Sequence, residues 1–314
     1  MSKPVSISVI VPIYGVEKFI ARFADSLLSQ DYPHIQFIFV NDETKDGSML
    51  VLNNLIEQCY FHLKERIVIV NKKNEGCPKA RRTGLSHATG DYVVHADPDD
   101  WFAEGAFTKI AAVAQQTQAD LLYFDYYKEY EAKGKTKYIS ERLYTIEKKD
   151  DYIRDMYNHR TCGSVWNKCV KRSVYMENPV YYPQTPSAED VCLMTQLVGY
   201  SSSLVHIQSP LYHYRRDNPG SVSKRNPKFR RYRAVVKFLD MYEFYNNMPQ
   251  DNVPIRSIYE DIVMKAGWSS IMHRFDLFTE RPYLAKDIRK ASISSRRETP
   301  VFAQIITKIY SIFA

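Results

Sequence analysis

The sequence has few cysteines and no long apolar run. Its five cysteines are scattered, and none forms a CxxC pair. An odd number without close pairs argues against a disulfide framework and favours free thiols in a reducing compartment. No apolar run approaches the ~20 residues that a transmembrane helix needs. The first residues lack the charged start and cleavage site of a signal peptide, so we expect a cytoplasmic protein.

Cationic residues outnumber acidic ones, with a formal net charge of +7. A basic surface can bind nucleic acid, an anionic membrane or a phosphorylated ligand, or it can simply be solvated. No nucleic-acid-binding motif accompanies the charge, so a nucleic-acid partner is not expected. Residues 301–313 have the spacing of a short amphipathic helix. That helix could pack against the protein or make peripheral contact with the inner membrane, and both interpretations stay open.

The first part of the chain alternates short β-branched segments with segments of helical spacing. The expected strands are Val5–Val11, Ile35–Val40, Arg66–Val70, Asp91–Ala96 and Leu121–Tyr126. The expected helices between them are Glu17–Ser29, Asp46–Leu63, Pro78–Ala88 and Glu104–Gln118. This alternation is typical of βαβ units, so we predict an α/β fold with a Rossmann-type, mainly parallel sheet flanked by helices.

The pattern changes after the fifth expected strand. Residues 127–148 differ from the alternation before them. Within them, Glu129–Lys137 is a charged, glycine-containing turn between tyrosine-rich flanks, which predicts a hairpin or an excursion from the sheet. The remaining expected elements are helices at Asp150–Tyr157 and Ala188–Gly199, strands at Leu204–Ile207 and Leu211–Arg215, and long helices at Asn226–Asn246 and Ser257–Arg274. We therefore expect one large core followed by a helical carboxyl-terminal region.

Three carboxylates occur in four positions at Asp97-Pro98-Asp99-Asp100, directly after the apolar run Tyr92–Ala96. Like charges this close repel each other unless a cation neutralises them. The carboxyl edge of an open α/β sheet is a usual ligand site, and divalent metals prefer one or two carboxylates plus substrate phosphates. The cluster therefore indicates a site for Mn²⁺ or Mg²⁺ and a phosphorylated ligand. A helix-capping loop is the competing interpretation.

Several further motifs follow one another in a specific order. They are Val9-Ile10-Val11-Pro12-Ile13-Tyr14, Val40-Asn41-Asp42 with Asp46-Gly47-Ser48, Asn74-Glu75-Gly76, Ala80-Arg81-Arg82-Thr83-Gly84-Leu85, Gly90-Asp91-Tyr92-Val93 and Asp97-Pro98-Asp99-Asp100-Trp101. Together they resemble the inverting, nucleotide-sugar-dependent glycosyltransferases of family 2, which have the GT-A fold. The resemblance covers roughly residues 5–216. It implies a nucleotide part at about 1–126, an acceptor part at about 127–216, and a helical region at 217–314.

The resemblance implies roles for residues near the first two strands. In the family, the carboxylate at the position of Asp42 accepts a hydrogen bond from uracil, which suits a group that can only accept. Pro12, Ile13 and Tyr14 correspond to the loop that brackets the base, and Glu17 to a group near the ribose. Without the resemblance, Asp42 reads as a turn residue and Glu17 as a helix start.

A second group of residues corresponds to the diphosphate site. Asp97-Pro98-Asp99 resembles the family's DXD motif, in which the first Asp contacts the nucleotide and the last binds the metal. Arg81 corresponds to a basic residue near the diphosphate, although an exposed helical arginine is the alternative. Arg215 or Arg216 could clamp the diphosphate through charge-assisted hydrogen bonds. His213 could be a late metal ligand, or it could be structural.

A third group corresponds to the acceptor side. Asp190 resembles the family's general base, which deprotonates the acceptor hydroxyl, and Glu189 is the second candidate. Acids in a first helical turn also interact favourably with the helix dipole, which is the plain alternative. Trp166 could form a wall of the acceptor site or pack in the core. Lys168 could neutralise phosphate or pair with Glu189.

These observations favour a metal-dependent glycosyltransferase. The expected reaction moves a sugar from a UDP-sugar to a hydroxyl of a glycan or lipid-linked acceptor in bacterial surface polysaccharide synthesis. A nucleotidyltransferase is an alternative, but the loop after the first strand has one glycine, Gly15, where a glycine-rich loop is expected. A non-catalytic sugar-nucleotide-binding protein is another alternative. A dinucleotide oxidoreductase is disfavoured because no GxGxxG motif follows that strand.

Overall fold

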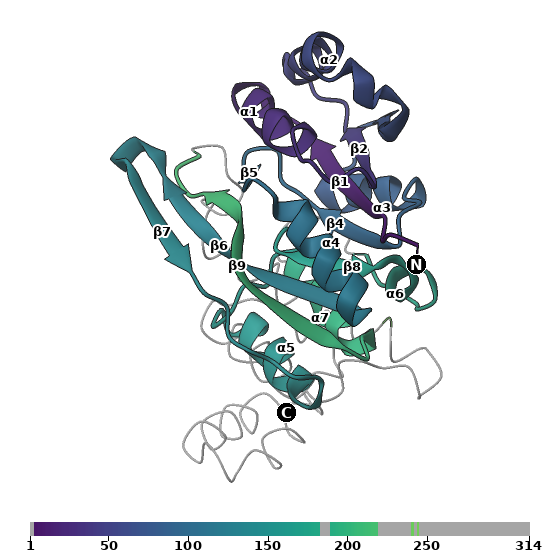
Figure 1. The fold of residues 1–314 in the computed structure, drawn as a ribbon, viewed down its shortest axis with the longest axis vertical. Coiled ribbons are helices and arrows are strands. Elements are labelled where there is room, and N and C mark those ends of the chain that lie inside the picture. Colours follow the sequence, from purple (N-terminus) through teal and green to yellow (C-terminus); the bar gives the residue numbers. More distant parts are fainter. Residues whose placement is uncertain (1–2, 183–188, 219–239, 242–243, 245–314) are drawn as a thin grey trace, which may run out of the picture.

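A single mixed sheet of nine strands is the centre of the fold (Figure 1). The computed structural model describes residues 3–182, 189–218, 240–241 and 244. Eight strands follow the order β3-β2-β1-β4-β8-β6-β9-β5, and β7 pairs with β6 outside this path. Helices cover both faces of the sheet, as the sequence predicted for an α/β protein.

The amino-terminal half of the sheet is parallel and matches the predicted alternation. Its strands are β1 Ile7–Ile13, β2 Ile35–Asn41, β3 Ile67–Asn71 and β4 Tyr92–His95. The helices that connect them are α1 Glu17–Leu28, α2 Ser48–Cys59 and α3 Cys77–Ser86. The predicted extension of the second helix to Leu63 is wrong, because α2 ends at Cys59 and a short 3₁₀ helix, Phe61–Arg66, follows.

The second half of the sheet mixes directions. Its strands are β5 Trp101–Phe102, β6 Leu121–Tyr130, β7 Lys135–Ile139, β8 Lys168–Lys171 and β9 Leu204–Arg215. Its helices are α4 Ala106–Thr117, α5 Lys149–Tyr157, α6 Arg172–Met176 and α7 Glu189–Tyr200. Strand β8 enters antiparallel between β4 and β6, which the sequence analysis did not predict. The predicted hairpin after β6 is confirmed as β6–β7, and the two predicted strands at 204–215 form one strand, β9, with an irregular register opposite Asp125.

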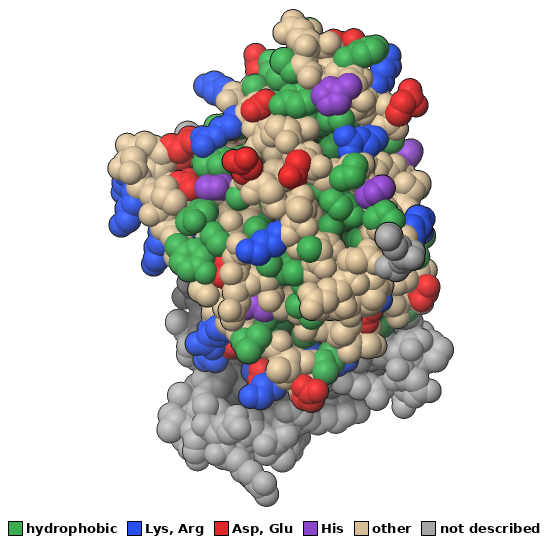
Figure 2. Space-filling model, in the orientation of Figure 1, with side chains coloured by type: hydrophobic (Ala, Val, Ile, Leu, Met, Phe, Trp, Pro, Cys, Tyr) green, Lys and Arg blue, Asp and Glu red, His purple; other side chains and the backbone are tan. Residues whose placement is uncertain are grey.

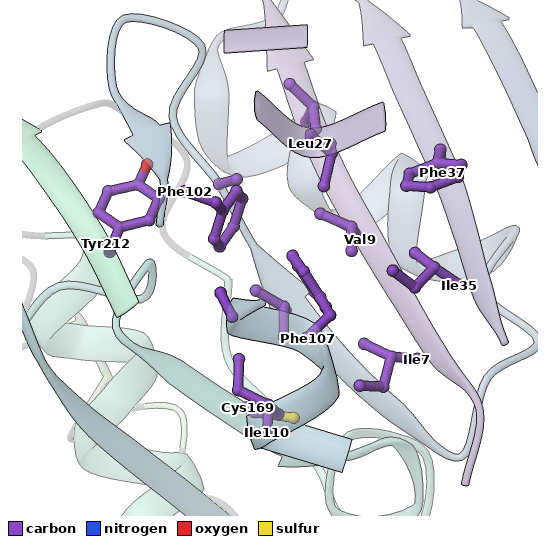
Figure 3. Packing of buried hydrophobic residues seen from close by; sticks show 14 of the residues in the cluster. Ile7, Val9, Leu27, Ile35, Phe37, Phe102, Phe107, Ile110, Cys169 and Tyr212 are labelled. Atoms are coloured by element: carbon purple, nitrogen blue, oxygen red, sulfur yellow. The ribbon is translucent and has the colours of Figure 1, made fainter. Parts of the chain in front are cut away.

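The side chains of β1 show how the sheet divides the core. Val9 and Val11 pack on the face covered by α1, α2 and α4, whereas Ile10 packs on the face of α3, α5 and α7. Figure 3 shows the first of these faces, with Leu27 and Phe107 directed toward the sheet. Apolar side chains on both faces explain why the strand reads as a continuous apolar run, as is typical of buried parallel strands.

Some predicted elements lie outside the described residues. These are the helices at 226–246 (except for residues 240, 241 and 244) and 257–274, the amphipathic segment 301–313, and part of the loop 178–186. Within the described part of the chain, we find no helix with the length and apolarity needed to cross a bilayer.

Candidate active site

The segment Asp97–Asp100 forms a tight turn between β4 and β5, at the carboxyl end of the parallel strands. The helix-capping interpretation is wrong, because the turn leads into β5, and α4 begins only at Ala106. The Asp100 carboxylate Oδ1 accepts a hydrogen bond from the backbone N–H of Arg215 at 2.8 Å. The hydroxyl of Tyr212 accepts one from the Asp97 N–H at 3.0 Å. Strand β9 thus fixes the turn from the side.

Two carboxyl groups of this turn, Asp97 and Asp100, have raised pKa values. Burial raises the pKa of Asp97 to about 6, and the charges of Asp190 and Asp99 add to the effect while Arg81 opposes it. Burial, together with Asp99 and Asp97, raises the pKa of Asp100 well above its usual range. The Oδ2 atom of Asp100 is buried without a hydrogen-bond partner among the described residues. The turn therefore holds more negative charge than its own surroundings neutralise.

Arg81 joins this turn to the helix α7. Its side chain lies on α3 and is 6% exposed. One Nη atom donates to Asp97 Oδ1 at 2.7 Å, and the other Nη atom donates to Asp190 Oδ1. Burial alone would lower the pKa of Arg81, but Asp190 and the other nearby acids raise it well above the usual value. The arginine is therefore always charged, and the alternative of an exposed helical arginine is wrong.

Asp190 and Glu189 open the described part of α7, as predicted for the family's carboxylate pair. The Asp190 side chain is 22% exposed, so one side of its carboxylate faces open space while Oδ1 contacts Arg81. Through Arg81, Asp190 is held beside the Asp97 turn.

Asp42 lies at the end of β2 and is 3% exposed. Its carboxylate accepts hydrogen bonds from Lys72 Nζ at 2.8 Å, from the Glu75 N–H at 3.1 Å and from the Gly76 N–H at 2.8 Å. It therefore ties the 72–76 loop to β2. Two carboxylate oxygens offer about four acceptor positions, so one remains for a further donor. Lys72 was not identified from the sequence, because a lysine in a loop carries no distinguishing pattern.

The predicted base-bracketing loop follows β1. Pro12 and Ile13 are buried in the strand, whereas Tyr14 is 55% exposed. Gly15 has a φ of +69°, which favours glycine, and its N–H donates to Thr44 Oγ1 at 2.8 Å. The Glu17 carboxylate accepts the N–H of Gly47 at 2.8 Å. The loop after β1 is thus fastened to the loop after β2, leaving Tyr14 available for a ligand.

The side chain of Arg215 is held by contacts with other residues of the protein. Its Nε donates to the backbone oxygen of Asp99 at 2.8 Å, and its guanidinium also contacts the carboxylate of Glu131. The guanidinium lies 5.2 Å from the ring centre of Trp101. These contacts tie Arg215 to the 97–100 turn.

His213 has its own partners. Its ring is stacked between Trp101 at 5.0 Å and Tyr127 at 4.8 Å, and Nδ1 lies 2.7 Å from a Glu129 oxygen. The structure therefore favours the structural interpretation of His213. Its metal-ligand role has no support from these contacts.

Two predicted acceptor residues are buried, and we correct their assignment. Trp166 is 2% exposed and stacks on Tyr212 and Tyr214, each at 4.9 Å, so it packs in the core. Lys168 is 1% exposed, and its Nζ donates to the carbonyls of Cys162 at 3.0 Å and Ser164 at 3.1 Å. Burial lowers the pKa of Lys168. Neither side chain faces an acceptor; both shape the loop beside α7.

Comparison with known proteins agrees with this geometry. The model of the family described as glycosyl transferase family 2 matches residues 8–177. The chain belongs to glycosyl transferase family 2. It is 27% identical over 214 residues to the glycosyltransferase EpsH of Bacillus subtilis, covering 67% of this chain and 60% of EpsH. It is 26% identical over 229 residues to the minor teichoic acid biosynthesis protein GgaB of the same organism, covering 70% of this chain and 24% of GgaB.

The family assignment extends to the fold. The structure of S. aureus TarS residues 1–349 in complex with UDP-GlcNAc superposes with a TM-score of 0.66 at 18% identity, covering 91% of this chain and 80% of that structure. This family 2 chain therefore has the GT-A fold. The chain spans less than two thirds of the length of EpsH and of GgaB.

The carboxylate turn of this family 2 protein fits a metal that is held jointly with a substrate. The described residues contain no group of three or more His, Cys, Asp or Glu side chains that could enclose a metal by themselves. The residues that could hold one are Asp99, which accepts a hydrogen bond from Asn218 at 2.7 Å, and the neighbouring carboxylates with their raised pKa values. One or two carboxylates plus phosphate oxygens are a normal ligand set for Mg²⁺.

Proposed function

We propose that this family 2 protein transfers a sugar, with inversion, from a UDP-sugar to a hydroxyl of a glycan or lipid-linked acceptor. The observation that carries the proposal is the bridge made by Arg81. One guanidinium contacts Asp97, the first carboxylate of the DXD-like turn, and Asp190, the proposed base. An inverting transfer needs both groups at one sugar, the first near the departing diphosphate and the second on the opposite side.

The donor site extends from the turn to the loops after β1 and β2. The remaining acceptor position of Asp42 suits the imide N–H of uracil, and the exposed ring of Tyr14 suits contact with the base. Glu17, fixed against Gly47, lies within the same pair of loops and is the proposed ribose contact. The bound nucleotide-sugar of TarS supports a nucleotide-sugar as the donor.

The reaction is a single displacement. The acceptor hydroxyl gives its proton to Asp190 as its oxygen forms a bond to the anomeric carbon of the donor. The bond from that carbon to the diphosphate oxygen breaks, and the electron pair leaves with UDP. A positioned base contributes about 10²–10⁴-fold to such a step. Arg81 keeps Asp190 oriented before the acceptor arrives.

A divalent ion, Mn²⁺ or Mg²⁺, would neutralise the charge that develops on the leaving diphosphate. Asp99 is the proposed ligand, with Asp97 beside it. Arg81 supplies further positive charge at the same edge of the site. The structure gives His213 other partners, so the proposal does not use it.

The acceptor is proposed to belong to a bacterial surface polysaccharide. The name of the relative GgaB places that protein in teichoic acid biosynthesis, which supports this class of acceptor. A cytoplasmic location, with peripheral contact at the inner membrane, would bring the enzyme to a lipid-linked acceptor.

Replacement of Arg81 by lysine tests the proposal. A single ammonium group cannot contact two carboxylates with the fixed fork of a guanidinium. We expect kcat/KM for sugar transfer to fall about 10²-fold, because the two carboxylates lose their relative position. Arg82→Lys, the next residue of α3, should stay near wild type. The measurement is transfer and hydrolysis of a panel of UDP- and GDP-sugars with Mn²⁺ or Mg²⁺.

Two outcomes would contradict the proposal. Turnover of no nucleotide-sugar by the wild-type chain would support a non-catalytic binding protein. Near-normal transfer by Arg81→Lys would show that the bridge between Asp97 and Asp190 is not needed.

A further inference from the structure

We infer that one face of the β6–β7–β9 segment binds an anionic, phosphate-bearing acceptor chain. This inference rests on the proposed function, since it names the chemical class of the acceptor. The β6–β7 hairpin projects from the body of the protein (Figure 1). Figure 2 shows cationic side chains along the edge of the molecule where that hairpin lies.

Side chains alternate between the two faces of a strand, and in this segment the alternation places the lysines and the carboxylates on opposite faces. One face carries Lys128 of β6 and both Lys135 and Lys137 of β7, since side chains two residues apart share a face. Arg216, directly after β9, continues the same side as Tyr214 and donates to its hydroxyl at 3.2 Å. The described residues of these strands place no carboxylate on this face. We call it the cationic face.

The carboxylates of the same strands lie on the opposite face and already have hydrogen-bond or histidine partners there. Asp125 accepts a hydrogen bond from the Tyr138 hydroxyl at 2.5 Å and lies 2.8 Å from a ring nitrogen of His206. Glu129 accepts one from Thr136 at 2.5 Å and contacts His213. These acids therefore do not compensate Lys128, Lys135 or Lys137. Within the described residues, the three lysines make no ion pair.

The register makes this arrangement costly in the absence of a ligand. Lys128 lies directly opposite Lys137 in the antiparallel pair, and Lys135 lies opposite Tyr130. Like charges directly opposite each other destabilise a sheet. Lysines on an edge strand can also discourage aggregation, but that role does not require two of them to face each other across strands. An anion bound between them would remove the repulsion.

Strand β9 connects the cationic face to the proposed active site. Tyr212 and Tyr214 lie on the same side of β9 as Arg216; Tyr212 is buried against Trp166, and its hydroxyl contacts the backbone of Asp97. Arg216 lies four residues beyond Tyr212, about 13 Å along an extended strand. The ring of Tyr130 on this side gives an amphipathic surface that suits a sugar ring. A chain of sugars or polyols with phosphate groups matches both the charge and this aromatic side chain.

The test compares three lysines with a matched set. We expect the wild-type chain to bind a poly(glycerol phosphate) oligomer, and a neutral dextran oligomer of similar length much less, with an affinity that weakens as salt is raised. The triple variant Lys128→Gln, Lys135→Gln, Lys137→Gln should bind the anionic oligomer about tenfold more weakly, since three exposed charge pairs are lost. The control variant Lys3→Gln, Lys64→Gln, Lys109→Gln changes the net charge equally, on exposed residues elsewhere, and should bind as the wild type does.

Donor hydrolysis without acceptor is measured in parallel. It should be equal in the wild type and in both triple variants, because none of these lysines belongs to the donor site. If both triple variants lose the same affinity, or neither loses any, the inference is wrong. Binding only to vesicles with anionic lipid, and not to the oligomer, would also overturn it and would assign the cationic face to a membrane. Absence of donor turnover in all variants would instead contradict the proposed function, while the binding comparison would still decide on the cationic face.

Discussion

At the scale of single residues, a substitution of Asp190 distinguishes an effect on catalysis from an effect on nucleotide binding. In the proposed reaction Asp190 takes the acceptor proton and does not contact the nucleotide. Asp190→Asn should therefore lower kcat for transfer by about 10²–10⁴-fold and leave the affinity for UDP unchanged. Glu189→Gln tests the second candidate for the base and should have a much smaller effect. Near-normal transfer by Asp190→Asn, or a larger loss with Glu189→Gln, would reverse this assignment.

The ionisation of Asp97 gives the protein a measurable pH dependence. Burial and the neighbouring acids raise its pKa from 3.8 to about 6. Donor binding that uses the ionised carboxylate should therefore weaken as the pH falls through about 6. The effect on stability has the opposite sign, because the folded state binds this proton more tightly than the unfolded state does. The resulting gain in the free energy of unfolding is complete below pH 3.8 and is lost as the pH rises through about 6.

Asp97→Asn removes this titration. We expect the difference in unfolding free energy between pH 5 and pH 7 to change by an amount on the order of 1 kcal/mol relative to the wild type. Chemical denaturation at the two pH values measures it, and donor hydrolysis at the same pH values measures the effect on binding. An unchanged pH dependence in Asp97→Asn would show that Asp97 is already ionised at pH 5.

At the scale of elements, the packing of α3 on the sheet positions Arg81. Gly84 faces the sheet, and a Cβ built there would lie 2.3 Å from Cγ2 of Ile10 in β1 and 3.2 Å from Cγ2 of Val40 in β2. The absence of a side chain lets the helix approach both strands. A helix displaced from the strands would move Arg81 away from Asp97 and Asp190.

Gly84→Ala should destabilise the protein by about 1–3 kcal/mol through overpacking, although alanine is the better helix former. Sugar transfer should fall as well, since Arg81 shifts with α3. The matched variant Ser86→Ala, on the exposed side of the same helix, should stay within about 0.5 kcal/mol of the wild type. Equal stability of the two variants, measured by urea unfolding, would show that the strands accommodate the extra methyl group.

Some strands were predicted accurately from the sequence, and another was missed. The strands β1 to β4 follow from local alternation of β-branched residues, and their observed bounds lie within two residues of the predicted ones at every end. Strand β8 was missed because Lys168-Cys169-Val170-Lys171 is short and mixes buried lysine with apolar residues. Its place between β4 and β6 depends on pairing with strands far away in the sequence.

At the scale of the whole molecule, ligand binding should stabilise the fold. A ligand at one hundred times its Kd adds about 2.7 kcal/mol to the free energy of unfolding. UDP with Mn²⁺ should therefore raise Tm by about 5 °C or more, and EDTA should remove most of that increase. Asp99→Ala should lose the metal-dependent part of the increase, whereas Asp151→Ala, an exposed acid on α5, should keep it. An equal metal-dependent shift in Asp99→Ala would place the metal on other residues.

The sequence by itself determined the family resemblance, the α/β alternation and most of the residues of the proposed site, because motifs and hydrophobic periodicity are local properties of the chain. Only the tertiary structure decided which of those residues meet. Arg81 and Asp190 are 109 positions apart, and their contact arises from the packing of α3 and α7 around one sheet. The same packing buried Trp166 and Lys168, for which the sequence had left an acceptor-side role open. Burial depends on everything that surrounds a side chain, and no local pattern contains that information.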